Sequence, residues 1–144
     1  MEKGKTTEAK VEKFEDLRIF VLARELNKLI YAITDRPAFY NDKRFTQQIH
    51  AATGSIMDNI AEGYERNSNK EFITFLYYAK GSCGEVRSQI IRAYDVNYIT
   101  KEEAKDIYNR LSHLSSAIYK FISKLKTSII NGDRYKSVDI DIFP

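Results

Sequence analysis

The sequence has few of the residues that interrupt regular structure. Its 144 residues include only six glycines and two prolines, which leaves few positions at which a chain of many short strands could turn. A domain of this length can bury a hydrophobic core without the help of metals or disulfides. The scarcity of turn residues therefore favours a single domain built of long helices.

Cysteine and histidine are also scarce. Cys83 is the only cysteine, so no intramolecular disulfide can form, and with His50 and His113 it makes no cluster that would hold zinc. The chain has no Glu-x-x-His pair of the kind that binds di-iron centres in helical bundles. It also has no glycine-rich phosphate-binding loop. We therefore expect a protein with no metal and no cofactor.

Long apolar runs are missing as well. No stretch approaches the roughly 18 apolar residues that a membrane span requires. Residues 1–13 mix lysine and glutamate without an apolar segment, and so resemble neither a signal peptide nor a membrane anchor. Together with the single cysteine, these absences predict a cytoplasmic protein without a membrane partner.

Four segments carry apolar residues at the spacings of three and four that are typical of amphipathic helices. The predicted helices cover about residues 14–33, 45–64, 69–94 and 101–130. Long helices joined by short loops pack against each other in antiparallel order. The sequence therefore predicts an all-α fold, an antiparallel up-and-down four-helix bundle over residues 14–130. Its fourth stripe includes Tyr108 as well as aliphatic residues.

The ends of the predicted helices have recognisable signals. Acidic residues after Phe14 favour a helix start there, and a polar loop should follow Arg36-Pro37. Ser68 and Thr100 each begin a capping box, with glutamate three residues later. We expect residues 1–13 to be flexible. The tail over residues 131–144 alternates apolar residues with aspartates and could pair as a strand, but we expect it to be flexible too.

The two middle segments lack charge over long stretches. Residues 45–57 and 72–79 contain no formally charged side chain, although a bundle helix that faces water should have a charged outer face. A strip offset from the core stripe contains Ile73, Tyr77, Gly81 and Gly84. Each glycine inside a helix costs about 1 kcal/mol relative to alanine, which suggests a close backbone approach. We expect an oligomer interface at this strip; the alternative is that it packs beneath loops or the tails.

Residues 81–84, with the sequence Gly-Ser-Cys-Gly, are the one place where nucleophilic side chains cluster. A catalytic cysteine or serine needs a base, usually histidine, within hydrogen-bond reach. Neither His50 nor His113 has an acidic partner in a recognisable pattern. We therefore expect no enzymatic activity, and interpret these small residues as a tight helix crossing.

Residues 59–63, with the sequence Asn-Ile-Ala-Glu-Gly, place two polar side chains near the end of an apolar helix. Glu62 lies near a helix C-terminus, where a negative charge is unfavourable. It could instead accept hydrogen bonds from the free N–H groups that begin the next helix, at residues 68–70. We interpret Glu62 as a structural clamp between helices, with an active-site carboxylate as the alternative.

These features together resemble a known family. The chain is similar to the four-helix-bundle proteins encoded in intervening sequences of bacterial large-subunit ribosomal RNA. The likeness rests on Phe14 to Leu17, Gln48-Ile49 with Ala52 and Ser55, Asn59 to Gly63, and Phe75-Leu76 with Ala79, Gly81-Ser82 and Glu85. The accessory protein of diversity-generating retroelements is similar in fold and binds nucleic acid.

The resemblance implies a cytoplasmic bacterial protein that forms a ring-like homopentamer. It implies no established enzymatic activity and a suspected nucleic-acid role. Asn59, Glu62 and Gly63 would be the family signature, and the resemblance assigns them no catalytic role.

The distribution of charge leaves two hypotheses for function. The formal net charge is only +3, but residues 101–130 contain six basic residues against three acidic ones. The first hypothesis is a homo-oligomeric scaffold that binds structured RNA or other nucleic acid. Its phosphate contacts would come from Lys80, Arg87, Lys120 and Lys124. The second hypothesis is an adaptor whose partner is a protein, docked on the aromatic surface or the tails.

Overall fold

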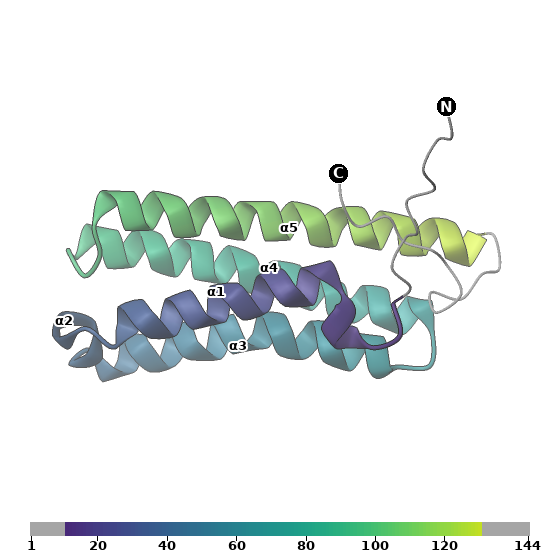
Figure 1. Ribbon diagram of the computed structural model, residues 1–144, viewed down its shortest axis with the longest axis horizontal. Coiled ribbons are helices and arrows are strands. Elements are labelled where there is room, and N and C mark those ends of the chain that lie inside the picture. Colours follow the sequence, from purple (N-terminus) through teal and green to yellow (C-terminus); the bar gives the residue numbers. More distant parts are fainter. Residues whose placement is uncertain (1–10, 131–144) are drawn as a thin grey trace, which may run out of the picture.

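The computed structural model describes residues 11–130, and this part of the chain is entirely helical apart from its short connections. The helices in chain order are η1 (Phe14–Asp16), α1 (Arg18–Thr34), α2 (Pro37–Tyr40), α3 (Lys43–Glu65), α4 (Asn69–Asp95) and α5 (Lys101–Ile130). The predicted all-α fold is confirmed. The long helices α1, α3, α4 and α5 run antiparallel to their neighbours along the chain (Figure 1). Residues 1–10 and 131–144, most of the two segments predicted to be flexible, lie outside the described residues.

Both predicted N-caps form, and Thr100 with Glu103 makes the full reciprocal capping box. The Ser68 hydroxyl accepts a hydrogen bond from the Glu71 N–H at 3.2 Å and starts α4. At the start of α5 the Thr100 hydroxyl accepts from the Glu103 N–H at 3.2 Å, and the Glu103 carboxylate accepts from the Thr100 N–H at 3.0 Å. Both caps satisfy N–H groups that the first turn of a helix leaves without partners.

The first long helix starts later than the acidic residues suggest. Phe14–Asp16 form only a 3₁₀ turn, and Leu17 is extended with ψ 130° before α1 begins at Arg18. The reason is packing, because Leu17 is completely buried and the Phe14 ring lies edge-on to the ring of Phe20 at 5.0 Å. A continuous helix from Phe14 was therefore a wrong prediction.

The segment predicted as a polar loop after Arg36 contains the short helix α2. Pro37 occupies its first turn, where the fixed φ of proline fits and no N–H is required. The turn buries Phe39 completely, and its ring lies 5.1 Å from the ring of Phe45 and 5.2 Å from that of Tyr98. The loop prediction was wrong because one aromatic residue among polar ones packs into the end of the bundle.

The apolar stripes meet in one core. Every long helix contributes side chains with no exposed surface, among them Ile30, Ile49, Leu76 and Leu114. Tyr108 is the exception in the fourth stripe, because 39% of its surface remains exposed. Within residues 11–130, no helix combines the length and the apolar character needed to cross a lipid bilayer.

Candidate nucleic-acid interface

A hollow of about 520 Å³ lies between the outward faces of α4 and α5. It is lined by Lys80 and Arg87 from α4 and by Ser112, Ser115, Ser116, Tyr119 and Lys120 from α5. Residues three or four positions apart share one face of a helix, so each helix presents its lining residues in a row. The hollow thus combines three cationic side chains, three serine side chains and one exposed aromatic ring.

A second hollow of about 240 Å³ follows along the same two helices toward the α4–α5 connection. Its lining residues are Ile90, Ile91, Tyr94, Lys101, Ala104, Lys105, Tyr108 and Asn109. The Arg87 guanidinium lies 5.9 Å from the centroid of the Tyr108 ring, which is within the range of a cation–π contact. Arg87 and Tyr108 therefore join the two hollows.

The same surface continues in the opposite direction to Tyr77 and Lys126. The Lys126 ammonium donates a hydrogen bond to the Tyr77 hydroxyl at 3.0 Å and lies 5.4 Å from the centroid of its ring. This hydrogen bond raises the pKa of Lys126 above its usual value. We refer to the surface from Tyr77 and Lys126 through the two hollows to Tyr94 and Lys101 as the α4/α5 groove.

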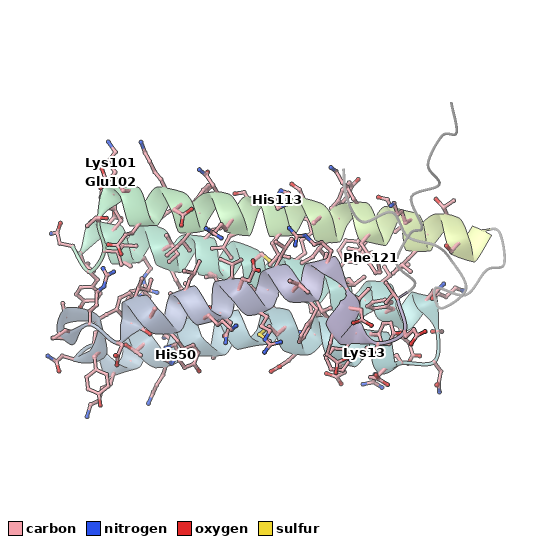
Figure 2. All side chains as sticks on the ribbon, in the orientation of Figure 1. Lys13, His50, Lys101, Glu102, His113 and Phe121 are labelled. Atoms are coloured by element: carbon pink, nitrogen blue, oxygen red, sulfur yellow. The ribbon has the colours of Figure 1, made fainter. Side chains whose placement is uncertain are left out.

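Acidic side chains are absent from the described residues that line these two hollows. Two of the three carboxylates of α5 are paired away from these hollows: Asp106 pairs with Arg110 at 3.1 Å in a hollow against α1, and Glu103 pairs with Arg36. Figure 2 shows Lys101 and Glu102 at the start of α5 and His113 midway along it. The cations of the two hollows thus have no acidic side chain among the described lining residues, an arrangement that favours an anionic ligand.

The structure brings together three of the four predicted phosphate-binding residues. Lys80, Arg87 and Lys120 line the central hollow, whereas Lys124 is exposed one turn further along α5 and lies outside that lining. The prediction omitted the tyrosines of the groove. Tyr108 was assigned to the core, although its spacing of eleven residues from Tyr119 places both on one helix face, a signal that the sequence did contain.

The predicted interface strip lies on the outer surface of α4. A Cβ atom added at Gly81 would meet no described neighbour within 4 Å, and one at Gly84 would meet only Arg87 Nη2, at 3.7 Å. Neither glycine therefore lies at a tight crossing between the described helices of one chain. Tyr77 and Gly84 border the groove, and Ile73 is half-buried. An oligomer contact at this strip stays a prediction.

The close helix approach occurs at Gly63. A Cβ at this position would lie 2.7 Å from Phe75 Cβ and 2.8 Å from Phe72 Cδ2, distances that folded proteins essentially never show. Glycine therefore allows the end of α3 to lie directly against the first turns of α4. In this way Gly63 fixes the position of α4, and with it one wall of the groove.

Asn59 and Glu62 have structural contacts. The Asn59 side-chain amide donates to the Ser55 carbonyl at 2.8 Å and to the Ser55 hydroxyl at 2.9 Å, and Ser55 in turn accepts from Ser82 on α4 at 3.0 Å. Glu62 is exposed and accepts from Arg66 at 2.9 Å. At the start of α4 it is Ser68 that caps the Glu71 N–H. The predicted clamp from Glu62 to residues 68–70 stays a prediction.

Cys83 belongs to the hydrophobic core. It has no exposed surface, and burial raises the pKa of its thiol to about 12, so the reactive thiolate is disfavoured. His50 is engaged elsewhere, because its Nε2 lies 2.7 Å from the Thr34 hydroxyl and its ring stacks on Tyr31. Burial lowers the pKa of His50. Cys83 therefore has the environment of a packing residue and not that of a nucleophile.

Comparisons with known proteins agree with this architecture. Residues 15–120 match the model of the family described as 23S rRNA-intervening sequence protein. A crystal structure of a protein of unknown function from the S23 ribosomal protein family of Bacteroides thetaiotaomicron is similar in fold, with a TM-score of 0.66 and 21% sequence identity. The match covers 72% of this chain and 97% of that one. Among proteins with curated descriptions, none matches this chain.

Proposed function

The chain belongs to the family of 23S rRNA-intervening sequence proteins, and from this premise we propose that it is a non-enzymatic, homo-oligomeric scaffold that binds RNA through the α4/α5 groove. The observation that carries the proposal is the convergence of Lys80, Arg87 and Lys120 on one hollow from two helices. Phosphate contacts supply much of the affinity of nucleic-acid-binding proteins. Cationic side chains in a hollow that is not lined by carboxylates are well suited to make such contacts.

Oligomerisation would repeat the groove around the assembly. Ile73 and Gly81 on α4, which line neither hollow of the groove, belong to the surface we assign to contact between copies, and a pentamer is the expected assembly. A mid-helix glycine with open space above it costs stability within the chain, which is offset if another backbone packs there. Several copies of one positive groove would bind a structured RNA more tightly than a single copy.

Fluorescence anisotropy with a labelled RNA hairpin, measured over a series of salt concentrations, tests the proposal. Log affinity should fall linearly with log salt concentration, because bound phosphates release their counterions. The double variant Lys80→Glu/Lys120→Glu should bind at least about a hundredfold more weakly at low salt, because two attractive contacts become repulsive. Light scattering on the same samples gives the mass of the assembly.

The matched control is Arg24→Glu/Lys28→Glu, which makes the same change in net charge on exposed positions of α1. It should retain most of the affinity for the hairpin. Equal losses in the two double variants would indicate a diffuse charge effect and contradict binding at the groove. Absence of binding at low salt would contradict the proposal altogether.

A protein partner is a second candidate, favoured by the end of the groove nearest the α4–α5 connection. Ile91 is half exposed there, beside Tyr94 and Tyr108, and exposed aliphatic and aromatic surface is typical of protein interfaces. Binding of a protein at this surface should depend little on salt. A protein adaptor with no nucleic-acid role is therefore distinguished from the RNA scaffold by the same salt series.

A further inference from the structure

We infer that the α4/α5 groove takes an unpaired, single-stranded polynucleotide segment, whose bases stack on exposed tyrosine rings while the flanking cations hold the phosphates. This inference rests on the proposed function and adds the conformation of the nucleic acid that the groove recognises. It follows from the aromatic residues of the groove, which phosphate binding alone does not explain.

Four tyrosines distribute exposed rings along the groove. Between 39% and 57% of the surface is exposed in each of Tyr77, Tyr94, Tyr108 and Tyr119. Aromatic side chains in this state gain by covering one ring face, and every nucleic-acid base has a face that stacks. The arrangement is thus suited to bases of any sequence.

Each of these rings has at least one cation beside it. Lys126 lies over Tyr77 and Arg87 over Tyr108, at 5.4 and 5.9 Å from the ring centroids. Tyr119 shares the central hollow with Lys80 and Lys120, and Tyr94 shares the second hollow with lysines of α5. A base stacked on a ring would place its own phosphate within reach of the adjacent cation. Alternation of rings and cations is the arrangement that binds single strands.

A duplex fits this surface poorly. Its bases already stack on each other and face the partner strand, so a double helix presents phosphates, sugars and base edges but no free base faces. The rings of Tyr108 and Tyr119 border hollows of about 240 and 520 Å³, which are the scale of one or a few bases. Only an unpaired strand can bring base faces to these rings.

Small residues line much of the central hollow. Ser112, Ser115 and Ser116 line it from α5, and on α4 Gly84 lies beside Arg87, where an added Cβ would meet only the Arg87 side chain. Serine hydroxyls can donate to a phosphate or pair with a ribose 2′-hydroxyl. The small residues therefore allow the strand to approach the helices closely.

The length of the groove sets a site size. Tyr77 and Tyr94 are 17 residues apart on α4, which at the helical rise corresponds to roughly 25 Å. A strand advances about 3.4 Å per nucleotide where its bases stack directly on one another, and further where a ring separates them. The groove should therefore hold at most about seven nucleotides.

Anisotropy with labelled oligoadenylate of increasing length, at low salt, tests this inference. We expect the RNA and DNA forms to bind, with affinity rising up to about seven nucleotides per chain and little beyond. The same strand paired to its complement, and a strand of equal length without bases, should bind at least about tenfold more weakly, because neither offers base faces for stacking. Preference for RNA over DNA would assign a role to the 2′-hydroxyl.

Two tyrosine variants with equal exposure give the matched comparison. Tyr119→Leu should weaken oligoadenylate binding about tenfold, whereas Tyr40→Leu, on α2 and equally exposed, should leave it unchanged. Tyr119→Trp should retain binding. Since the chain has no other tryptophan, quenching of the Trp fluorescence of Tyr119→Trp by oligoadenylate reports stacking directly. The fluorescence of Tyr40→Trp should not be quenched.

The outcomes separate this inference from the proposed function. If duplex and single strand bind equally and Tyr119→Leu has no effect, while Lys80→Glu/Lys120→Glu still abolishes binding, stacking is overturned and phosphate binding stands. If the lysine variant has no effect on any nucleic acid, the proposed function itself is overturned. Circular dichroism of each variant must show the same helicity, so that loss of binding is not loss of fold.

Discussion

The two flanks of α4 contain similar residues and use them differently. On the flank against α3, Ser82 donates to Ser55, and the Arg92 guanidinium lies 4.4 Å from the centroid of the Phe45 ring, which is buried. On the flank against α5, Arg87 lies over Tyr108, whose ring is exposed beside an open hollow. The α3 flank is closed, with Ser82 and Arg92 both in contact with side chains of α3. The α5 flank is open, which is why we place the binding surface there.

The largest effect on stability should come from the tightest contact of the closed flank. Gly63→Ala places a Cβ 2.7 Å from Phe75 Cβ, and overpacking of this kind should lower the free energy of unfolding by about 1–3 kcal/mol. Urea denaturation measures it. An unchanged midpoint would mean that α3 and α4 can separate at little cost, and the flank could not then be called closed.

Reversing the charge of one arginine on each flank of α4 compares the two flanks directly. Arg87→Glu should lower the affinity for the RNA hairpin about tenfold, because its guanidinium faces the groove, while Arg92→Glu should change that affinity less than about twofold. Arg92→Glu should instead lower stability by about 1 kcal/mol, through loss of the cation–π contact. Anisotropy and urea denaturation give the two readouts, and equal effects on affinity would remove the distinction between flanks.

Replacing Gly81, on the outer surface of α4, with alanine should change the free energy of unfolding in the opposite direction to Gly63→Ala. Gly81→Ala meets no described neighbour within 4 Å, so the higher helix propensity of alanine should raise the free energy of unfolding by up to about 1 kcal/mol. The measurement is thermal or urea unfolding at a protein concentration where light scattering finds monomer. Loss of the oligomer in this variant would support Gly81 as part of the interface; retention would argue against it.

The smallest effect concerns the start of α5. The bidentate contact with Arg36 is the main reason that the pKa of Glu103 is lowered to about 2 from its usual 4.5. Because the folded pKa is the lower one, its contribution is present above about pH 4.5 and is lost as pH falls toward 2. Both side chains are partly exposed, so the contribution should not exceed about 1 kcal/mol.

Glu103→Gln should therefore reduce stability slightly at pH 7 and much less at pH 2 to 3. Glu102→Gln, at the neighbouring exposed position, is the control and should show a smaller pH-dependent difference. Urea denaturation at several pH values makes the comparison. Identical pH profiles for the two variants would show that the Arg36 contact does not stabilise the fold in solution.

Sequence patterns predicted the helices well where the signal was local. Ser68 and Thr100 cap helices as their spacing to glutamate indicates, because a capping box involves only residues within one turn. The errors occurred where distant packing decides the local conformation. Phe14 and Phe39 lie in short turns that pack aromatic rings against other helices, and no pattern in the neighbouring residues predicts those contacts.

The candidate site was predicted in part for the same reason. Lys80 and Arg87 lie on one face of a helix at a spacing of seven residues, which the sequence alone shows. Tyr108 was assigned to the core because aromatic residues at core spacing are usually buried, and its exposure depends on how far α5 is rotated toward α4.

The sequence by itself determined the all-α architecture, its helix caps and the rows of cations on two helix faces, since these depend on spacing along one chain segment. Only the tertiary structure decided that Lys80 and Lys120, forty positions apart, line one hollow with Tyr119 and without carboxylates. The physical reason is that helix periodicity fixes which side chains share a face, whereas packing in the core fixes which faces meet.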